Sequence, residues 1–187
     1  MQLAGRSRVP VVGFIESGGA RMQEGTAALA GYGRIFRQNV LLTGVVPQIS
    51  VIGGLSAGGG CYSPALTDFV VMTRHAAMFL TGPGVVRDVM GEDVTAADLG
   101  GYKVHERNGV TDLVVADDRA GAAAARALLS YLPQHAGGRL PRILATDPAL
   151  DDPGAAVPVD PRQVYDVRDA IAGIVDGDSM LEIAPRW

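Results

Sequence analysis

Two glycine-rich segments of the chain carry residue types that can bind an anion or a developing negative charge. The first covers residues 16–25, with the sequence ESGGARMQEG, and the second covers residues 53–62, with the sequence GGLSAGGGCY. Glycines leave main-chain N–H groups unobstructed, and a helix start adds free amide donors and the positive end of the peptide dipoles. We therefore expect a phosphate, a carboxylate or an enolate to bind at one or both segments.

The alternative for each segment is a tight strand-to-helix turn without a ligand. Glycine is common wherever an α/β fold turns, so a single Gly-Gly pair favours this simpler interpretation. The three consecutive glycines of Gly58–Gly60 exceed what a connection needs and indicate close approach of a ligand.

The elements around these segments follow from the spacing of apolar residues. Short β-branched runs bounded by Gly, Pro and Ser predict strands, and apolar residues at three- and four-residue steps predict helices. Strand, helix and strand in succession imply a parallel crossover. The expected strands are Val9–Ile15, Val45–Ile52, Asp68–Thr73 and Ala77–Leu80, and the expected helices are Thr26–Leu42, Ala116–Leu132 and one within 165–175.

Composition excludes several classes of protein. The 187 residues are 48% hydrophobic, enough for one core, and the net charge of −4 argues against a nucleic-acid partner. The single Cys61 cannot form an internal disulfide, and no long apolar stretch or signal-like segment is present, so we expect a cytoplasmic protein without a membrane partner. Cys61 could be a nucleophile, but a small buried residue under the turn is the favoured role.

Other chemistry has weaker support. The glycines near residues 31–34 and 82–85 do not complete a dinucleotide fingerprint, and no phosphate loop of the Gly-Lys-Ser/Thr type is present. Several acidic residues could be metal ligands but are expected to be solvated helix caps, so no metal is predicted; they are Glu92, Asp93, Asp98, Asp117 and Asp118. Asp68 is expected to anchor a helix or turn. The histidines, His75, His105 and His135, lie outside both glycine segments.

The glycine segments resemble those of one known family, the carboxyltransferase (β) subunits of biotin-dependent acyl-CoA carboxylases. Residues 17–25, SGGARMQEG, are similar to the family's S-G-G-A-R-[IM]-Q-E-G, and residues 57–69, AGGGCYSPALTDF, are similar to its A-G-G-x-x-Y-S-P-A-L-T-D-F. The stretches 79–86, 91–95 and 98–101 continue in the family's order. The form of residues 21–25 resembles most closely the propionyl-CoA and acetyl-CoA carboxylating branch.

The resemblance implies a fold and a domain organisation. The fold would be the α/β, crotonase-like (ClpP/crotonase) spiral of ββα units, incomplete at the N-terminus. Residues 1–135 would form the core of an N-terminal carboxyltransferase domain, and residues 136–187 a Pro/Gly-rich connector and helix leading toward an absent C-terminal domain.

The resemblance also implies an activity. The chain would belong to an enzyme that transfers a carboxyl group from carboxybiotin, carried on a partner protein, to the α-carbon of acetyl-CoA or propionyl-CoA. The implied partners are acyl-CoA, a biotin carboxylase or biotin carrier subunit, and either further copies of the chain or a complementary C-terminal domain. No side-chain base is required, because the biotin enolate left after decarboxylation is taken to remove the proton.

The resemblance places the site on main-chain amides. The expected donors to the thioester enolate are Gly18, Gly19 and Ala20 from the first segment and Gly58, Gly59 and Gly60 from the second. The residues expected to bind CoA are Arg21, Ser56, Ala57 and Gly82. Arg21 has a structural alternative, a local pair with Glu24 or support of the glycine turn.

Two other functions remain open at this stage. The chain could be a truncated, non-catalytic CoA-binding or assembly module whose apolar edge needs a partner. It could also be a component of an acyl-CoA decarboxylase that shares the CoA-side motif.

Overall fold

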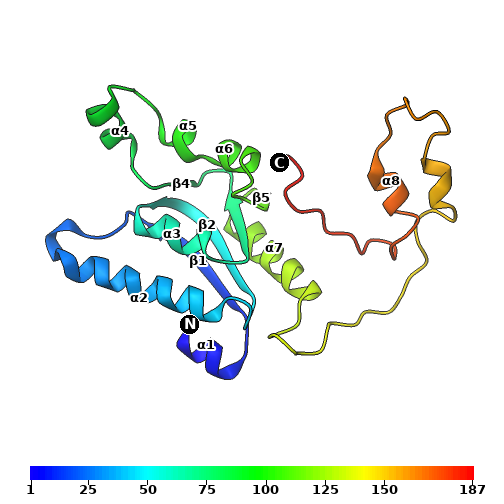
Figure 1. The fold of residues 1–187 in the computed structure, drawn as a ribbon, viewed down its shortest axis with the longest axis horizontal. Helices are drawn as coiled ribbons and strands as arrows, with labels where there is room; N and C mark the ends of the chain where they lie inside the picture. Colours follow the sequence, from blue (N-terminus) through cyan, green and yellow to red (C-terminus); the bar gives the residue numbers. More distant parts are fainter. The chain divides into compact units, whose positions relative to one another are not determined.

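A parallel sheet forms the centre of the fold. The computed structural model describes residues 1–187, and four strands lie in the order β1 (Val11–Ser17), β2 (Gln48–Ala57), β3 (Phe69–Thr73) and β5 (Leu113–Val115). A fifth strand, β4 (Ala77–Phe79), pairs with the C-terminal part of β2 (Figure 1). Every pairing between these strands is parallel, and for β1 and β2 the strand–helix–strand pattern predicted this.

Helices connect the strands. The first crossover contains α2, which spans Thr26–Leu42 as predicted. The helix predicted over residues 116–132 is α7, and its bounds are Asp118–Tyr131 because the Asp117 side chain caps its first turn, accepting the Ala120 N–H at 2.8 Å. The remaining helices of this part of the chain are α1 (Gln2–Ser7), η1 (Met22–Glu24), α3 (Gly59–Ala65), α4 (Pro83–Met90), α5 (Ala96–Gly100) and α6 (Tyr102–Arg107).

Strand β2 is longer than predicted. The sequence predicted its end at Ile52, but the strand continues through Gly53 and Gly54 to Ala57. Glycine occupies these two strand positions because neighbouring side chains lie close to the backbone. A Cβ at Gly53 would be 2.7 Å from the Asp118 carboxylate, and one at Gly54 would be 2.7 Å from that of Glu16.

The hydrophobic core follows the two central strands. Ile49, Val51 and Ile52 of β2 and Val71 and Met72 of β3 are fully buried. Such continuous burial is expected of parallel strands that are covered on both faces. The edge strand β1 differs, because its residues alternate between half-buried and exposed, and Phe14 is 55% exposed.

A buried polar network joins α2, β2 and α3. The Asn39 amide donates to Gln48 Oε1 at 3.1 Å, and Gln48 Nε2 donates to the Asn39 carbonyl at 3.0 Å. Ser63 of α3 donates to Asn39 Oδ1 at 3.0 Å. Asp68 accepts the Gln48 main-chain N–H at 2.8 Å, so it anchors the start of strand β2 rather than the helix or turn that was expected. Buried polar groups that are satisfied in this way fix one arrangement of the elements.

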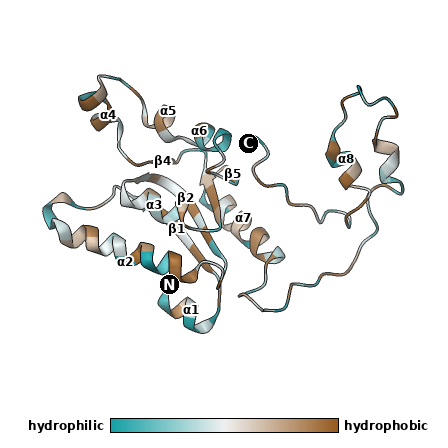
Figure 2. Ribbon diagram, viewed as in Figure 1, coloured by the Kyte–Doolittle hydropathy of each residue, from teal (hydrophilic) through white to brown (hydrophobic).

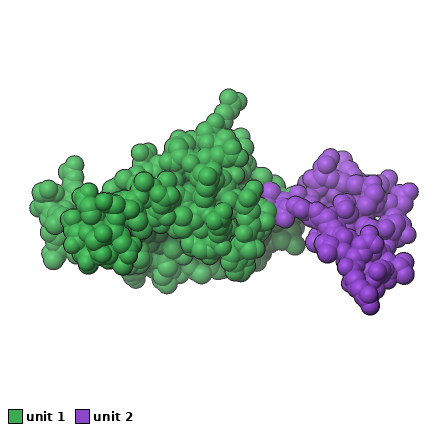
Figure 3. All heavy atoms as spheres, turned by 90° about the horizontal axis from the view of Figure 1, so that it is seen from above, with its two compact units in different colours: residues 1–141, 183–187 green, residues 142–182 purple.

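The chain divides into two compact units, coloured separately in Figure 3. The first contains the sheet and consists of Met1–Pro141 and Ile183–Trp187. The second, Arg142–Glu182, contains η2 (Pro153–Ala156) and α8 (Val167–Ile171), the latter shorter than the region predicted to be helical. Within it, Arg168 contacts the Asp166 carboxylate at 2.6 Å, and this guanidinium lowers the pKa of Asp166.

Glycines inside helices provide a test of this packing. A Cβ at Gly33 of α2 would have no atom within 4 Å, whereas a Cβ at Gly121 of α7 would be 2.6 Å from Val51 Cγ1. We expect Gly33→Ala to raise the free energy of unfolding by about 0.5–1 kcal/mol through helix propensity. Gly121→Ala should lower it by about 1–3 kcal/mol through overpacking. Urea unfolding followed by circular dichroism measures both, and a stabilised Gly121→Ala would contradict the helix–sheet contact.

Asp112 gives the β3–β5 pairing a pH dependence. Its carboxylate accepts the Val70 N–H at 2.7 Å, and burial is the main cause that raises the pKa of Asp112 above its ordinary value. A raised carboxyl pKa means that the folded state binds the proton more tightly than the unfolded chain does. The resulting stabilisation is present below the ordinary carboxyl pKa and is lost as pH rises through the raised value.

We therefore expect Asp112→Asn to lose less stability than the parent between about pH 4 and pH 7. The asparagine carbonyl still accepts the Val70 N–H, while the cost of burying a charge disappears. Thermal unfolding of both proteins across this range measures the difference. Parallel pH profiles would show that Asp112 does not contribute.

Candidate functional site

The two glycine turns meet at the carboxyl ends of β1 and β2. The strands pair in register with Ser17 opposite Ser56, so the turns that follow them leave the sheet side by side. A Cβ at Gly19 would lie 3.0 Å from the Ala57 carbonyl oxygen and 3.8 Å from Gly58 Cα. The structure thus brings together the residues that the sequence analysis selected from the two segments.

Backbone conformation explains why glycine occupies the centre of each turn. Gly19 has a φ of 93° and Gly58 a φ of 55°, a region that residues with a Cβ rarely adopt. At Gly19 the neighbouring Ala57 carbonyl also excludes a side chain. The close approach of the two turns therefore depends on glycine at both positions.

The amides of the two turns fall into two groups. Gly19 N–H donates to Ser17 Oγ at 3.2 Å, and Gly58 N–H donates to the Phe79 carbonyl at 3.1 Å, so both are engaged within the protein. The amides of Gly18, Ala20, Gly59 and Gly60 have no acceptor. Gly59 and Gly60 begin α3, where the first N–H groups of a helix have no intrahelical partner. These four donors are available to a ligand oxygen.

The other predicted site residues occupy varied environments. Ser56 is fully buried, and its hydroxyl faces the Ile15 carbonyl at 3.5 Å between the two strands. Ala57 ends β2 and borders Gly19. Gly82 precedes α4 as its N-cap. The Arg21 side chain is 80% exposed and lies 3.8 Å from Glu24 in a loose ion pair.

The acidic residues and histidines lie outside this arrangement. Asp98 interacts with Thr95 at the start of α5, and Asp117 caps α7, as expected. His105 Nε2 lies 2.6 Å from the Met78 carbonyl, and His135 Nδ1 lies 2.8 Å from the Ala136 carbonyl. No group of three or more His, Cys, Asp or Glu side chains has the geometry to hold a metal ion.

Tyr32 also lies in this region, although the helix predicted over Thr26–Leu42 gave it no part in the site. Its ring lies 2.6 Å from the position of a Cβ at Gly59, and its hydroxyl lies 2.7 Å from Ser17 Oγ. Helical spacing could identify Tyr32 as inward-facing, but not as the neighbour of Gly59, which lies far along the chain.

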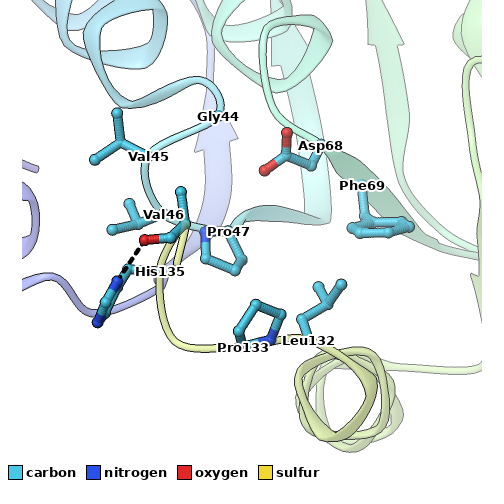
Figure 4. A pocket seen from close by; sticks show the side chains of 10 residues that line it. Gly44, Val45, Val46, Pro47, Asp68, Phe69, Leu132, Pro133 and His135 are labelled. Carbon is cyan, nitrogen blue, oxygen red and sulfur yellow. Dashed lines mark hydrogen bonds between the residues drawn. The ribbon is translucent and has the colours of Figure 1, made fainter. Parts of the chain in front are cut away.

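An apolar pocket lies at the opposite end of the sheet. It has a volume of about 310 Å³ and is lined by residues preceding β2, at the start of β3 and after α7. Figure 4 shows Pro47, Phe69, Leu132 and Pro133 around it, with the Asp68 carboxylate at its border. Because these residues lie at the amino ends of the strands, the pocket is separate from the glycine turns.

Helix α4, beyond the second turn, carries an exposed apolar face. Val85, Val89 and Met90 are all exposed, and Figure 2 colours most of this helix as hydrophobic. None of the helices in the structure combines the length and the apolar character needed to cross a lipid bilayer.

Comparison with known families gives a match over the whole chain. Residues 1–187 match the carboxyl transferase domain. The chain belongs to the carboxyl transferase domain family. This confirms the resemblance drawn from the two glycine segments.

Relatives of this carboxyl transferase domain include several enzymes. The methylmalonyl-CoA carboxyltransferase 12S subunit of Propionibacterium freudenreichii subsp. shermanii is 47% identical over 98% of the chain. The methylmalonyl-CoA decarboxylase subunit alpha of Propionigenium modestum is 43% identical over 100% of the chain, and the propionyl-CoA carboxylase beta chain of Roseobacter denitrificans is 42% identical over 100%. The chain spans only 36%, 37% and 38% of these relatives, respectively.

Solved structures confirm the fold. A structure of transcarboxylase 12S, described as a hexamer with hydrolysed methylmalonyl-CoA bound, has a TM-score of 0.94 and 45% identity. It covers 99% of this chain, which in turn covers 37% of that chain. The carboxyl transferase domain therefore has the α/β crotonase-like fold that the resemblance implied.

Cys61 provides a test of the second turn. It lies in α3 directly after Gly60, it is buried, and burial raises the pKa of its thiol. A raised pKa keeps the thiol neutral and unreactive at neutral pH. We expect Ellman's reagent to label Cys61 only after the protein is unfolded in denaturant. Rapid labelling of the folded protein would contradict the structural role and favour a nucleophile.

Proposed function

We propose that this chain forms the CoA-side half of a biotin-dependent acyl-CoA carboxyltransferase. The proposed reaction transfers a carboxyl group from carboxybiotin to the α-carbon of acetyl-CoA or propionyl-CoA. One observation carries this proposal: two glycine turns from adjacent strands lie in contact and present the unengaged amides of Ala20, Gly59 and Gly60. The names of the relatives, which include propionyl-CoA carboxylase and methylmalonyl-CoA carboxyltransferase chains, support the same reaction class.

The proposed reaction uses main-chain amides and requires no catalytic side chain. Loss of a proton α to a thioester carbonyl places negative charge on the carbonyl oxygen, and preorganised N–H donors stabilise this enolate more than the ground state. Each such donor contributes about 3 kcal/mol of selective stabilisation. In this proposal Ala20 supplies a donor from the first turn and Gly59 or Gly60 a donor from the second. Gly19 and Gly58, which have positive φ, shape the two turns, and Gly18 offers a further free amide in the first.

The remaining predicted residues take supporting roles. Ala57 and the buried Ser56 place the second turn through the backbone of β2. The exposed Arg21 is free to move from its loose pair with Glu24 toward a CoA phosphate. Gly82 borders the site through the segment that accepts the Gly58 amide.

Biotin and its carrier are assigned to a partner of this chain. Carboxybiotin supplies the carboxyl group and, once that group is released, the base that removes the α-proton. Residues 1–135 form the proposed CoA-side domain, and residues 136–187 the proposed connector toward a biotin-side domain, in a cytoplasmic assembly with a biotin carboxylase or carrier subunit and further copies of the chain.

A decarboxylase component is the second candidate. It is supported by the 43% identity to methylmalonyl-CoA decarboxylase subunit alpha. Both functions need the same CoA thioester site, and they differ in where the carboxyl group goes. Release of CO2 from methylmalonyl-CoA by the assembled complex would favour the decarboxylase, whereas net carboxylation of propionyl-CoA would favour the carboxylase.

Calorimetric titration with acetyl-CoA and propionyl-CoA tests the proposed site. We expect micromolar binding to the parent chain and at least tenfold weaker binding to Gly18→Val. A Cβ at Gly18 meets no atom within 4 Å, so the valine side chain occupies open space beside the first turn without disturbing the fold. Position 59 is less suitable, because a side chain there meets the Tyr32 ring.

Gly84→Ala serves as the matched control. Gly84 lies in α4 and likewise has no atom within 4 Å of its Cβ position. This variant should bind acyl-CoA like the parent. Absence of binding to the folded parent, or equal binding by all three proteins, would contradict a thioester site at the glycine turns.

A further inference from the structure

The side chain of Tyr32 contacts both glycine turns. It extends from α2, and a Cβ at Gly59 would meet its ring atoms Cγ and Cδ1 at 2.6 Å. Such a distance shows that the ring lies directly against the Gly59 backbone. The Tyr32 hydroxyl lies 2.7 Å from Ser17 Oγ, at the end of β1.

Ser17 extends this contact to the first turn. Its Oγ accepts the Gly19 N–H at 3.2 Å, while a Cβ at Gly60 would be 2.9 Å from Ser17 Cβ. Ser17 and Tyr32 therefore form one hydroxyl pair that contacts Gly19 on one side and the start of α3 on the other.

Neighbouring rings limit the movement of Tyr32. Its ring centroid lies 6.0 Å from that of Phe36, and the Phe36 centroid lies 5.6 Å from that of Tyr62 in α3. Both distances are in the range of favourable aromatic pairs. The three rings hold α2 against α3, so the position of the Tyr32 hydroxyl is set by packing as well as by its hydrogen bond.

We propose that Tyr32 and Ser17 are positioning residues that set the spacing between the Ala20 amide and the Gly59 and Gly60 amides. Ser17 of this pair accepts the Gly19 N–H, and this hydrogen bond fixes the first turn. The next amide along the chain, that of Ala20, has no acceptor. The Tyr32 ring fixes the start of α3 from the other side. This inference rests on the proposed thioester site, because the spacing matters only if one oxygen binds both sets of amides.

Tyr32→Phe separates the hydroxyl from the ring. The variant keeps the contact with Gly59 and loses the hydrogen bond to Ser17. We expect the affinity for propionyl-CoA to fall about fivefold, while the affinity for free CoA, which has no thioester oxygen, stays unchanged. Ser17→Ala should produce the same selective loss, and the double variant little more, because both changes remove one interaction.

Tyr62→Phe is the matched control. It removes a hydroxyl from the same aromatic cluster, but the Tyr62 hydroxyl makes no hydrogen bond, so its affinities should match the parent. Thermal unfolding of each variant establishes that the fold is retained.

The outcomes distinguish this inference from the proposed function. If the parent binds propionyl-CoA no better than free CoA, the thioester site fails and the positioning role fails with it. If the parent prefers propionyl-CoA and Tyr32→Phe keeps that preference, only the positioning role is overturned. An equal loss for both ligands would show general destabilisation and also contradict the positioning role.

Discussion

The arrangement of the site depends on one steric constraint, the contact between the turns that follow β1 and β2. Parallel pairing places the carboxyl ends of both strands at one edge of the sheet, with Ser17 opposite Ser56. The turns can then meet because Gly19 leaves room for the Ala57 carbonyl and Gly58 adopts a positive φ that residues with a Cβ rarely take. Four unengaged amides lie in these turns as a result of strand pairing and glycine, without any ionisable side chain.

Buried polar contacts preserve this arrangement. Asn39 and Gln48 exchange two hydrogen bonds, and Ser63 adds a third from α3. Each partner would leave a buried group unsatisfied if the helices shifted, which is more costly than the hydrogen bond itself is favourable. The network therefore fixes α3 at Ser63, one turn after its glycines, and links the position of that helix to β2.

The sequence predicted α2 and the parallel crossover because the spacing of apolar residues and the glycine-rich turns are patterns within short segments. They also selected Gly19 and Gly58, whose conformations only glycine readily adopts. They did not predict that β2 continues through Gly53 and Gly54, because glycine there was taken to mark a turn. The side chains that leave room only for glycine, Asp118 and Glu16, are remote in sequence or on another strand. The engagement of the Gly58 amide by Phe79 and the place of Tyr32 were likewise set by tertiary contacts.

The pairing of β1 with β2 also determines when the site can arise during folding. Helix α2 lies between the two strands, so their register joins segments far apart in the chain, such as Val11 and Gln48. Closing such a connection costs chain entropy before the strand contacts form, and non-local pairing is slow compared with helix formation. In a partly folded chain that already contains α2 but lacks the β1–β2 pairing, the turns that follow these two strands are not yet in contact. Ligand recognition here is accordingly a late event, coupled to completion of the sheet rather than to its first helix.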